Sequence, residues 1–459
     1  MRSTPSTARS SSIAHSDALI VASATPWGRS AIAVVRVSGA GLRRALAQVC
    51  APKGGWPPPR RARLCDWFDE RGVFDEGLLT IFPGSRSYTG EPLAELSCHG
   101  NPVIVERLLA ALVGAGARVA EPGEFTRRAF LNGRMDLTRA EAVLQAISAA
   151  TPAGVELARA GLDGAVAALV DTLRDGLTDA IAELEARLDH PTEDLTFEDD
   201  GALVARLGAL GSSTNAAAAT FQAGRVLVDG ATVALVGPVN AGKSSLFNAL
   251  GGSTRALVSP KPGTTRDVVE RRVVLDSVAV TLLDTAGERD GTDDLEAEGI
   301  ALGRALTADA DLLLVIIPAH APARAAETLA RTAGRPRLLV GNHADRPGAQ
   351  ARVDGQPMLM TCARTGEGVD ALRAAIAEAL VGEQPGGARL VIASQRQRDL
   401  LLEVAHAVEA GIEALTGDAG WAVAAEELYG ALGRLDHLDG RDTREAVLDR
   451  LFSRFCIGK

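Results

Sequence analysis

The spacing of hydrophobic residues divides the chain into stretches of different texture. Residues 17–134 alternate short apolar runs typical of strands, at 17–24, 31–39 and 78–82, with one amphipathic helix at 101–116. Residues 135–228 are rich in Ala and have apolar positions three and four residues apart, which predicts long amphipathic helices. Strands and helices alternate at 231–382, and helical spacing returns from about residue 391.

This order of helix, α/β and helix indicates one domain inserted into another, which compact domains with adjacent termini tolerate. We therefore expect an α+β domain at 17–134, a helical domain at 135–228 and 385–459, and an α/β domain at 229–384 between its two parts. Residues 1–16 are rich in Ser, with two Arg and no acid. They are short for a transit peptide, so we expect a disordered tail.

Composition narrows the class of protein. A chain of 459 residues exceeds one hydrophobic core, and its net charge of −10 argues against nonspecific coating of nucleic acid, although a local basic patch could still contact RNA. Five scattered cysteines suggest neither a disulfide framework nor a zinc site. The longest apolar runs, such as 311–319, are too short to span a membrane. We expect a cytoplasmic protein without a membrane partner.

A phosphate-binding loop stands at the start of the α/β domain. A buried strand, a Gly-rich loop and a helix follow one another at 231–250, and Gly237, Gly242, Lys243 and Ser244 fit the pattern G-x-x-x-x-G-K-[ST]. Glycines let backbone N–H groups wrap phosphates at a helix N-terminus. Lys243 would meet the β- and γ-phosphates, and the Ser244 hydroxyl would bind Mg²⁺.

Further motifs follow in the order expected for a GTPase. Thr265 in the segment 262–267 would complete the Mg²⁺ shell, and Asp284 ends a hydrophobic strand before Gly287, whose N–H can reach the γ-phosphate. Asn342 and Asp345 follow another strand, where the Asp carboxylate can accept from the guanine N1 and N2 hydrogens. We expect the nucleotide contacts Asn240, Ala241, Gly242, Lys243, Ser244, Ser245, Ser259, Pro260, Lys261, Pro262, Gly263, Thr264, Thr265, Asp284, Thr285, Ala286, Gly287, Asn342, Asp345, Cys362, Ala363 and Arg364.

With these motifs in place, nearly the whole chain resembles the MnmE (TrmE) family of tRNA modification GTPases. The resemblance is carried by residues 24–39, 87–102 and 122–143 and by the terminal LFSRFCIGK. It implies a Ras-like P-loop GTPase domain inserted into an all-α helical domain, preceded by an α+β folate-binding and dimerisation domain. His343 and Cys362 depart from the family, which usually has Lys and Ser at these two positions of the guanine site.

The resemblance implies that a potassium ion replaces the arginine finger of other GTPases. Asn240, Ser259, Lys261 and Thr264 match the K⁺-binding positions, and a cation there would offset charge on the departing phosphoryl group. Glu296 matches the catalytic Glu that orients the attacking water. Glu288, directly after the D-T-A-G turn, is the competing candidate, and we interpret it as an exposed switch residue.

The resemblance also implies a site for a tetrahydrofolate derivative, in the 5,10-methylene or 5-formyl form. Arg36, Glu95 and Lys459 fall on folate contacts, and Arg134 occupies a fourth where Lys is usual. Cys456 lies in the terminal signature beside the expected one-carbon group. It is either a reactive thiol or a small buried hydrophobe.

The function implied is that of a GTP hydrolase in tRNA maturation. As a homodimer with an FAD-dependent MnmG-type partner, it would add a carboxymethylaminomethyl-type group to C5 of the tRNA wobble uridine. The alternative is a GTPase switch in ribosome assembly, although no GXXG loop with a basic surround is evident outside the GTPase domain. A purely structural folate-binding protein conflicts with the intact GTPase motifs. The tRNAs served and the amine donor are left open.

Overall fold

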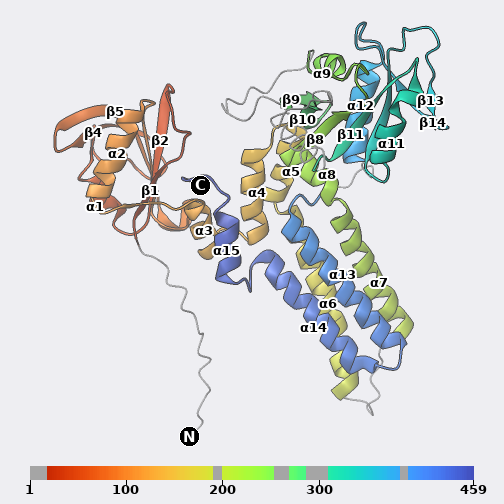
Figure 1. The fold of residues 1–459 in the computed structure, drawn as a ribbon. Helices are drawn as coiled ribbons and strands as arrows, with labels where there is room; N and C mark the ends of the chain where they lie inside the picture. Colours follow the sequence, from red (N-terminus) through yellow and green to blue (C-terminus); the bar gives the residue numbers. More distant parts are fainter. Residues whose placement is uncertain (1–17, 190–198, 253–267, 286–308, 383–390) are drawn as a thin grey trace, which may run out of the picture. The chain divides into compact units, whose positions relative to one another are not determined.

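The structure is a computed structural model that describes residues 18–189, 199–252, 268–285, 309–382 and 391–459 (Figure 1). The chain forms two compact units. The first comprises Met1–Ala140 together with Thr443–Lys459, and the second comprises Glu141–Asp442. Helix α4 (Leu137–Ser148) contains the boundary between them. The first and the last described residues therefore belong to the same unit.

The first unit is built on a seven-stranded sheet in the order β3-β4-β5-β6-β2-β1-β7. All neighbours pair antiparallel except β1 and β7, which pair parallel. The strands are β1 (Ile20–Ser23), β2 (Ile32–Ser38), β3 (Cys50–Pro52), β4 (Arg63–Asp69), β5 (Gly72–Phe82), β6 (Leu93–His99) and β7 (Arg118–Val119). Its helices are α1 (Leu42–Leu46), η1 (Gly84–Arg86), α2 (Pro102–Gly114), α3 (Glu124–Leu131) and α15 (Glu445–Phe452).

Helix α2 covers one face of this sheet. It begins at Pro102 after Asn101, whose side chain accepts a hydrogen bond from the N–H of Val103, so a good N-cap and a proline in the first turn start the helix. Buried apolar residues alternate along β2 and β6, as a half-buried sheet requires, and they share one core with α2. That core includes Val35, Val37, Leu96, Val105, Leu108 and Leu112.

The C-terminal segment returns to the loop that precedes α3. The N–H groups of Gly123 and Phe125 donate to the carbonyls of Cys456 and Lys459, at 3.4 and 3.1 Å. Gly458 lies against β1, where an added Cβ would stand 2.2 Å from the Ser23 carbonyl oxygen. Our expected boundaries placed 385–459 in the helical domain, whereas 443–459 group with the first unit. The hydrophobic spacing of α15 could not reveal this, because periodicity identifies a helix but not its partner.

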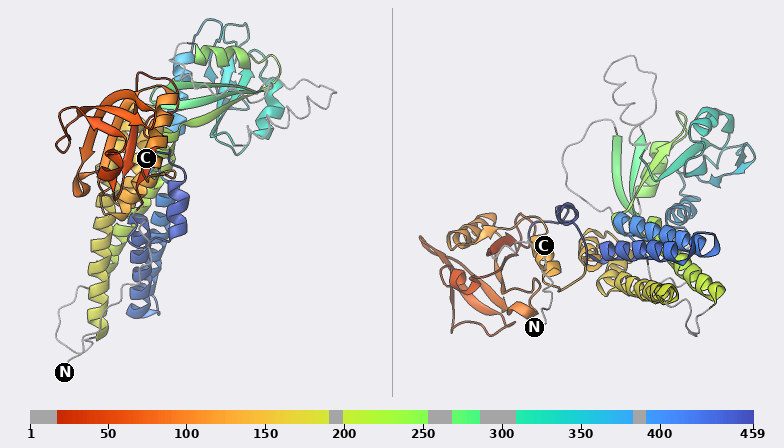
Figure 2. Two further views of the ribbon diagram at one scale, coloured as in Figure 1. Left: turned by 90° about the vertical axis from the view of Figure 1, so that its left-hand side faces the viewer. Right: turned by 90° about the horizontal axis from the view of Figure 1, so that it is seen from below.

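Long helices form the host part of the second unit. They are α5 (Pro152–Leu162), α6 (Ala165–Asp189), α7 (Asp200–Ala219), α8 (Phe221–Asp229), α13 (Gln395–Thr416) and α14 (Gly420–Asp439). Helix α6 lies beside α14, and α7 beside α13, although more than 170 residues separate the partners in each pair (Figure 2). Leu173, Leu177 and Leu184 of α6 share a core with Leu401 of α13 and Leu428 of α14. This is the apolar stripe that the Ala-rich sequence predicts.

The inserted α/β domain has a six-stranded sheet in the order β15-β12-β11-β8-β10-β9. Only β9 runs antiparallel to its neighbour. Its elements are β8 (Ala231–Val236), α9 (Lys243–Gly251), β9 (Val268–Leu275), β10 (Val278–Thr285), β11 (Leu312–Pro318), η2 (Pro322–Ala325), α11 (Ala326–Arg331), β12 (Arg337–Asn342), β13 (Arg352–Val353), β14 (Gln356–Pro357), β15 (Leu359–Met360) and α12 (Val369–Val381).

Helices cover both faces of this sheet. Helices α9 and α12 contribute Leu246 and Leu372 to a core with Val233 of β8, while Leu329 of α11 packs in a second core with Leu313 of β11. A doubly wound sheet of this kind binds ligands beyond the carboxyl ends of its strands. The loops after β8, β10 and β12 are therefore the place to look for a site.

The insertion is fixed where the chain crosses between host and inserted domain. The N–H of Ile392, on the returning segment, donates to the Thr220 hydroxyl at 2.9 Å. Arg225 of α8 pairs with Asp311 before β11 at 2.5 Å, and the other Asp311 oxygen accepts from the N–H of Thr232 at 2.8 Å. An α+β domain, a helical domain and an inserted P-loop α/β domain are thus all present, and the predicted fold class is confirmed.

The crossing generates a stability prediction. Gly224→Ala should lower the free energy of unfolding by about 1–3 kcal/mol, because the new methyl group would stand 2.2 Å from the Ile392 carbonyl oxygen and backbone would have to move. Gly208→Ala in α7 is the matched control. Nothing lies within 4 Å of its added Cβ, so it should raise stability by about 0.5–1 kcal/mol. Urea unfolding followed by circular dichroism measures both, and equal shifts in the two variants would contradict the packing at Ile392.

Candidate GTP and folate sites

The loop between β8 and α9 has the backbone of a phosphate cradle. Gly237 and Gly242 both have positive φ, at 154° and 85°, and so does Asn240, at 61°. An added Cβ at Gly242 would stand 2.2 Å from the Asn342 side-chain nitrogen, and one at Gly237 would stand 2.3 Å from the Ile316 carbonyl oxygen. Only glycine fits these two positions. Lys243, Ser244 and Ser245 follow in the first turn of α9, and both serines are exposed.

Two polar groups at this loop fit a nucleotide and its cation. The ammonium group of Lys243 donates to the carbonyls of Gly237 and Pro238, at 2.9 and 3.2 Å, so it lies over the loop. At the end of β10, Asp284 is 5% exposed, and its Oδ1 has no hydrogen-bond partner among the described residues. A buried carboxylate oxygen without a donor is costly unless a cation approaches it. The donor set therefore fits Mg²⁺.

Asn342 joins the phosphate loop to the loop behind the base. Its side chain is buried, donates to the Ala241 carbonyl at 2.9 Å and accepts from the N–H of Ala363 at 3.2 Å. Both bonds use the amide, which offers a donor and an acceptor on one planar group. Asn342 therefore sets the spacing between phosphate and base contacts. Cys362 is buried beside Ala363.

Asp345 is held as a carboxylate at the mouth of the site. Arg364 donates to it at 2.9 Å, and this hydrogen bond, together with one from the Cys362 thiol, holds the pKa of Asp345 below its usual value. An ionised carboxylate only accepts, which is what two guanine N–H donors require. Asn342, Asp345, Cys362, Ala363 and Arg364 are thus gathered at the carboxyl ends of β12 and β15, and their contact with GTP stays a prediction.

His343 occupies the position where the family usually has Lys. Its backbone is left-handed, with φ 63°, and its ring lies edge-on to His320 with centroids 5.7 Å apart. Burial, with Arg346 and His320 nearby, lowers the pKa of His343. A neutral imidazole therefore replaces a cationic chain beside Gly242, where an added Cβ would be 3.0 Å from the His343 Nε2.

Several predicted contacts fall outside the described residues. They are Ser259, Pro260, Lys261, Pro262, Gly263, Thr264, Thr265, Ala286, Gly287 and Glu296, together with the competing Glu288. The backbone of Thr285 is described as the last residue of β10. The K⁺ loop and the catalytic Glu therefore stay predictions.

A second cluster of predicted residues lies in the first unit, on the sheet face away from α2. Arg36 and Glu95 are register partners on β2 and β6 and form an ion pair of 2.7 Å. The Arg36 guanidinium carbon lies 5.5 and 5.8 Å from the ring centroids of Tyr88 and Phe125, within cation–π range. Both of its bonds to Glu95 go to Oε1. No described donor uses the other carboxylate oxygen, which leaves it for a ligand amino group.

The C-terminus completes this cluster. Arg36 also reaches the Gly458 carbonyl at 3.5 Å, which brings Lys459 to the same place. Arg134 is exposed and lies beside the Tyr88 loop, because a Cβ on Gly90 would be 3.3 Å from the Arg134 Cγ. Cys456 is exposed, so the alternative of a small buried hydrophobe is wrong.

Comparison with known proteins covers nearly the whole chain. A family model described as "GTP-binding protein TrmE N-terminus" matches residues 19–134, and one described as "MnmE helical domain" matches residues 137–456. The tRNA modification GTPase MnmE of Akkermansia muciniphila is 41% identical over 96% of this chain and 98% of its own length. That of Halorhodospira halophila is 42% identical, over 96% and 95%. The chain belongs to the MnmE family of tRNA modification GTPases.

Membership of the MnmE family confirms the resemblance inferred from the motifs and the assignment to the GTPase class. It favours tRNA modification over the ribosome-assembly switch that the GTPase motifs alone left open. Among the described helices, we find none whose length and apolar character would suffice for a membrane span.

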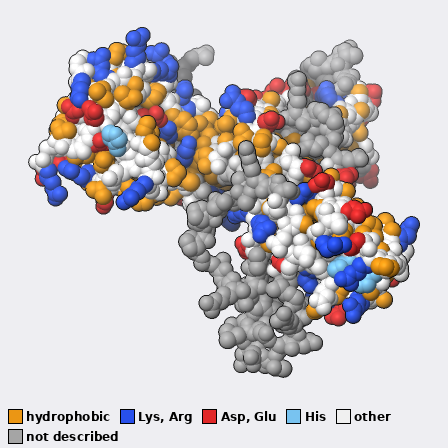
Figure 3. Space-filling view, turned by 90° about the horizontal axis from the view of Figure 1, so that it is seen from above, with side chains coloured by type: hydrophobic (Ala, Val, Ile, Leu, Met, Phe, Trp, Pro, Cys, Tyr) orange, Lys and Arg blue, Asp and Glu red, His pale blue; other side chains and the backbone are white. Residues whose placement is uncertain are grey.

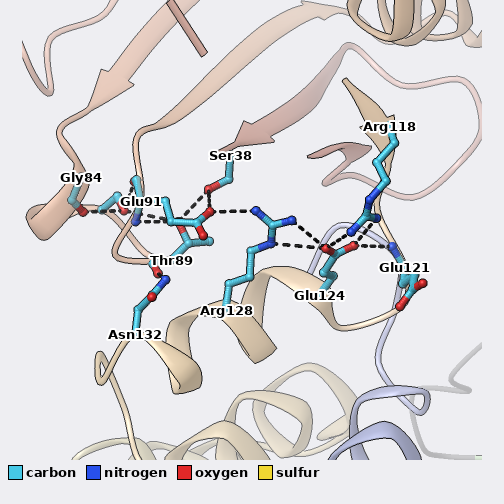
Figure 4. A network of polar contacts seen from close by, with 10 residues as sticks. Ser38, Gly84, Thr89, Glu91, Arg118, Glu121, Glu124, Arg128 and Asn132 are labelled. Atoms are coloured by element: carbon cyan, nitrogen blue, oxygen red, sulfur yellow. Dashed lines mark hydrogen bonds and ion pairs between the residues drawn. The ribbon is translucent and has the colours of Figure 1, made fainter. Parts of the chain in front are cut away.

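The sequence did not point to the polar network that supports the Arg36 cluster (Figure 4). Arg128 of α3 is buried and pairs with Glu91 and Glu124, both at 2.9 Å, and Glu124 also pairs with Arg118 at 2.6 Å. Ser38 of β2 hydrogen-bonds Thr89 at 2.7 Å. The network ties α3, which carries Phe125, to the loop that carries Tyr88. Removing one partner of a buried ion pair typically lowers the free energy of unfolding by about 3–5 kcal/mol. The network therefore helps to keep Tyr88 and Phe125 in place.

Tyr88 and Phe125 are functional candidates that the sequence reading missed. Both stand in the stretches that carry the family resemblance, and Tyr88 is one of only two tyrosines in the chain. Burial raises the pKa of Tyr88, so its phenol stays neutral and donates to or accepts from Thr126 at 2.9 Å. Because only 3% of the residues are aromatic, an aromatic residue within a family motif could have been singled out from the sequence.

Proposed function

We propose that this chain is a K⁺-stimulated GTPase of tRNA maturation. Together with an FAD-dependent MnmG-type partner, it would add a carboxymethylaminomethyl-type group to C5 of the wobble uridine, using a tetrahydrofolate one-carbon unit. The observation that carries the proposal is the coexistence of two built clusters in one chain of the MnmE family: the Asn342-linked GTP site and the Arg36–Glu95 pair beside the C-terminus.

In the GTPase domain, backbone N–H groups of the loop 237–243 would hold the phosphates, and Lys243 would turn from the loop carbonyls to the phosphate oxygens. Ser244 and Thr265 would bind Mg²⁺, with the orphaned Asp284 oxygen directed at its shell. Asn240, Ser259, Lys261 and Thr264 would hold K⁺, whose charge offsets that on the departing phosphoryl group. Asp345 would read guanine.

In the first unit, Glu95 would accept from the amino edge of the pterin, and Arg36, Arg134 and Lys459 would meet the carboxylates of the folate. The Tyr88 and Phe125 rings lie within cation–π distance of the Arg36 guanidinium group and would keep it in position for the ligand. Cys456, exposed in the terminal segment, is the candidate reactive thiol. We further propose a cytoplasmic homodimer, joined through the first unit, that acts on tRNA.

Potassium dependence tests the GTPase assignment. GTP turnover by the full-length protein should be at least about 10-fold faster in KCl than in NaCl at equal ionic strength, since transition-state charge otherwise lacks a counter-ion. Asn240→Gly keeps the left-handed backbone but removes the side-chain ligand, so it should remove most of that difference. Equal turnover of the parent protein in the two salts would exclude the potassium site.

A second test separates the two candidate water-orienting residues. Glu296→Ala should lower kcat by about 100-fold with little change in GTP affinity, because a water-positioning group acts on the transition state. Glu288→Ala is the matched control and should turn over almost normally. Single-turnover hydrolysis at saturating GTP, alongside a fluorescent-nucleotide titration, measures both. The reverse result would assign the role to Glu288.

Calorimetric titration with 5-formyl-tetrahydrofolate tests the first unit. Arg36→Ala and Glu95→Ala should each weaken binding by about 10-fold or more, the scale of hydrogen bonds to charged groups, while GTP affinity stays unchanged. Arg107→Ala is the control, because Arg107 pairs with Asp69 at 2.7 Å and stacks on Phe74 in the same unit, away from the C-terminus. Unaltered binding in both site variants would refute the folate site.

A further inference from the structure

The positive charge of the chain is concentrated in the first unit. Met1–Ala140 and Thr443–Lys459 contain 22 Lys and Arg against 14 Asp and Glu, a net charge of +8, so the second unit carries −18 of the total −10. Within residues 18–65 there are eight Lys and Arg and no acid at all. Such an asymmetry between parts of one chain is a sign of a polyanionic partner.

The arginines of the first unit fall into two groups by their partners. Most pair with a carboxylate, as Arg36 does with Glu95, Arg107 with Asp69 and Arg128 with Glu91. Others form no ion pair with any described carboxylate, and we name six of these, on or next to α1, the loop 53–62 and η1, the arginine rim; all six except the half-buried Arg63 are exposed. The rim consists of Arg43, Arg44, Arg60, Arg61, Arg63 and Arg86.

Printed contacts hold three of the rim residues, Arg43, Arg60 and Arg63, in or against the segment that leads into β4. Arg43 of α1 stacks on Trp56, its guanidinium carbon 4.5 Å from the ring centroid. Arg60, in the loop after β3, donates to the carbonyl of Arg86 at 2.5 Å. Arg63, which begins β4, donates to the carbonyls of Gly54 and Gly55. These contacts link α1 to the loop 53–62 through Trp56, and the loop to η1 through the Arg86 carbonyl.

These contacts orient the guanidinium groups of Arg43, Arg60 and Arg63 without neutralising them. Their partners are an aromatic ring and backbone carbonyls, which bear no net charge. Three consecutive prolines, Pro57, Pro58 and Pro59, precede Arg60 and fix φ along the loop, so less entropy is lost when a ligand binds. Figure 3 shows Lys and Arg side chains, in blue, at several points along the outer edge of the first unit. Because no described carboxylate pairs with these arginines, the electrostatic potential around them stays positive although the net charge of the whole protein is negative.

We propose that the arginine rim binds the phosphate backbone of tRNA. The planar guanidinium fork matches phosphate oxygens in two-point contacts, and several forks along one edge suit a polymer of phosphates. The acidic second unit would repel the same polymer and so orient it toward the rim. This inference rests on tRNA being the substrate under the proposed function, and it adds the surface that receives it.

The test uses the full-length protein and an unmodified tRNA transcript in fluorescence anisotropy titrations over a range of KCl concentrations. The triple variant Arg60→Gln, Arg61→Gln, Arg86→Gln should bind at least about 10-fold more weakly, and its salt dependence should fall by about two in log–log slope. A second variant, Arg43→Gln with Arg44→Gln, should weaken binding from the α1 side. Neither should alter GTP turnover, because the rim is remote in sequence from every GTP contact.

The matched control removes three positive charges from exposed arginines of the acidic unit, as Arg159→Gln, Arg324→Gln, Arg331→Gln, and should bind tRNA like the parent. Equal weakening by both triple variants would overturn the rim in favour of net charge alone. A rim variant that binds tRNA normally but loses phosphatidylglycerol vesicles would overturn it in favour of a membrane surface. In both cases, K⁺-stimulated GTP turnover by the parent protein would still support the proposed function. If the parent protein neither hydrolyses GTP nor binds tRNA, both the proposed function and the arginine rim are refuted.

Discussion

The return of the last residues to the loop before α3 is the contact on which the organisation of the chain depends. The N–H groups of Gly123 and Phe125 bind carbonyls of that segment, and Gly458 fits against β1 only because it lacks a Cβ. Everything between the two parts of the first unit is therefore an insertion, and the GTPase domain is a second insertion within it. Loop-closure entropy grows by only about 0.6 kcal/mol for each doubling of length, so such nesting is tolerated when both crossings are well packed.

The sequence predicts best where local chemistry leaves few choices. The phosphate loop needs glycine at 237 and 242 because neighbouring atoms approach within about 2.3 Å of where a Cβ would be. The sequence shows these two glycines at the spacing of the pattern G-x-x-x-x-G-K-[ST]. Asn342 and Asp345 were predicted for the same reason, since a short motif follows a strand. The three-part architecture followed from a change of hydrophobic period along the chain.

Long-range packing was the part that the sequence could not specify. The helix α15 reads as one more amphipathic helix, and its place beside α3 depends on contacts with residues over three hundred positions away. Tyr88 and Phe125 carry no motif of their own, and they matter only because folding puts both rings under one guanidinium group. The sequence alone also does not show that Arg128 pairs with two carboxylates whereas Arg61 pairs with none of the described ones.

The position of Asp311 has a mechanical consequence. One carboxylate holds Arg225 of α8 with one oxygen and the backbone at the start of β8 with the other, while the returning chain is held at Thr220. A domain joined to its host by a single strand could rotate about that strand, whereas this one is joined at two crossings and by an ion pair. Any displacement of β11 must therefore break the Arg225–Asp311 ion pair or move α8 as well. A conformational change at the nucleotide site would in this way reach the helical host.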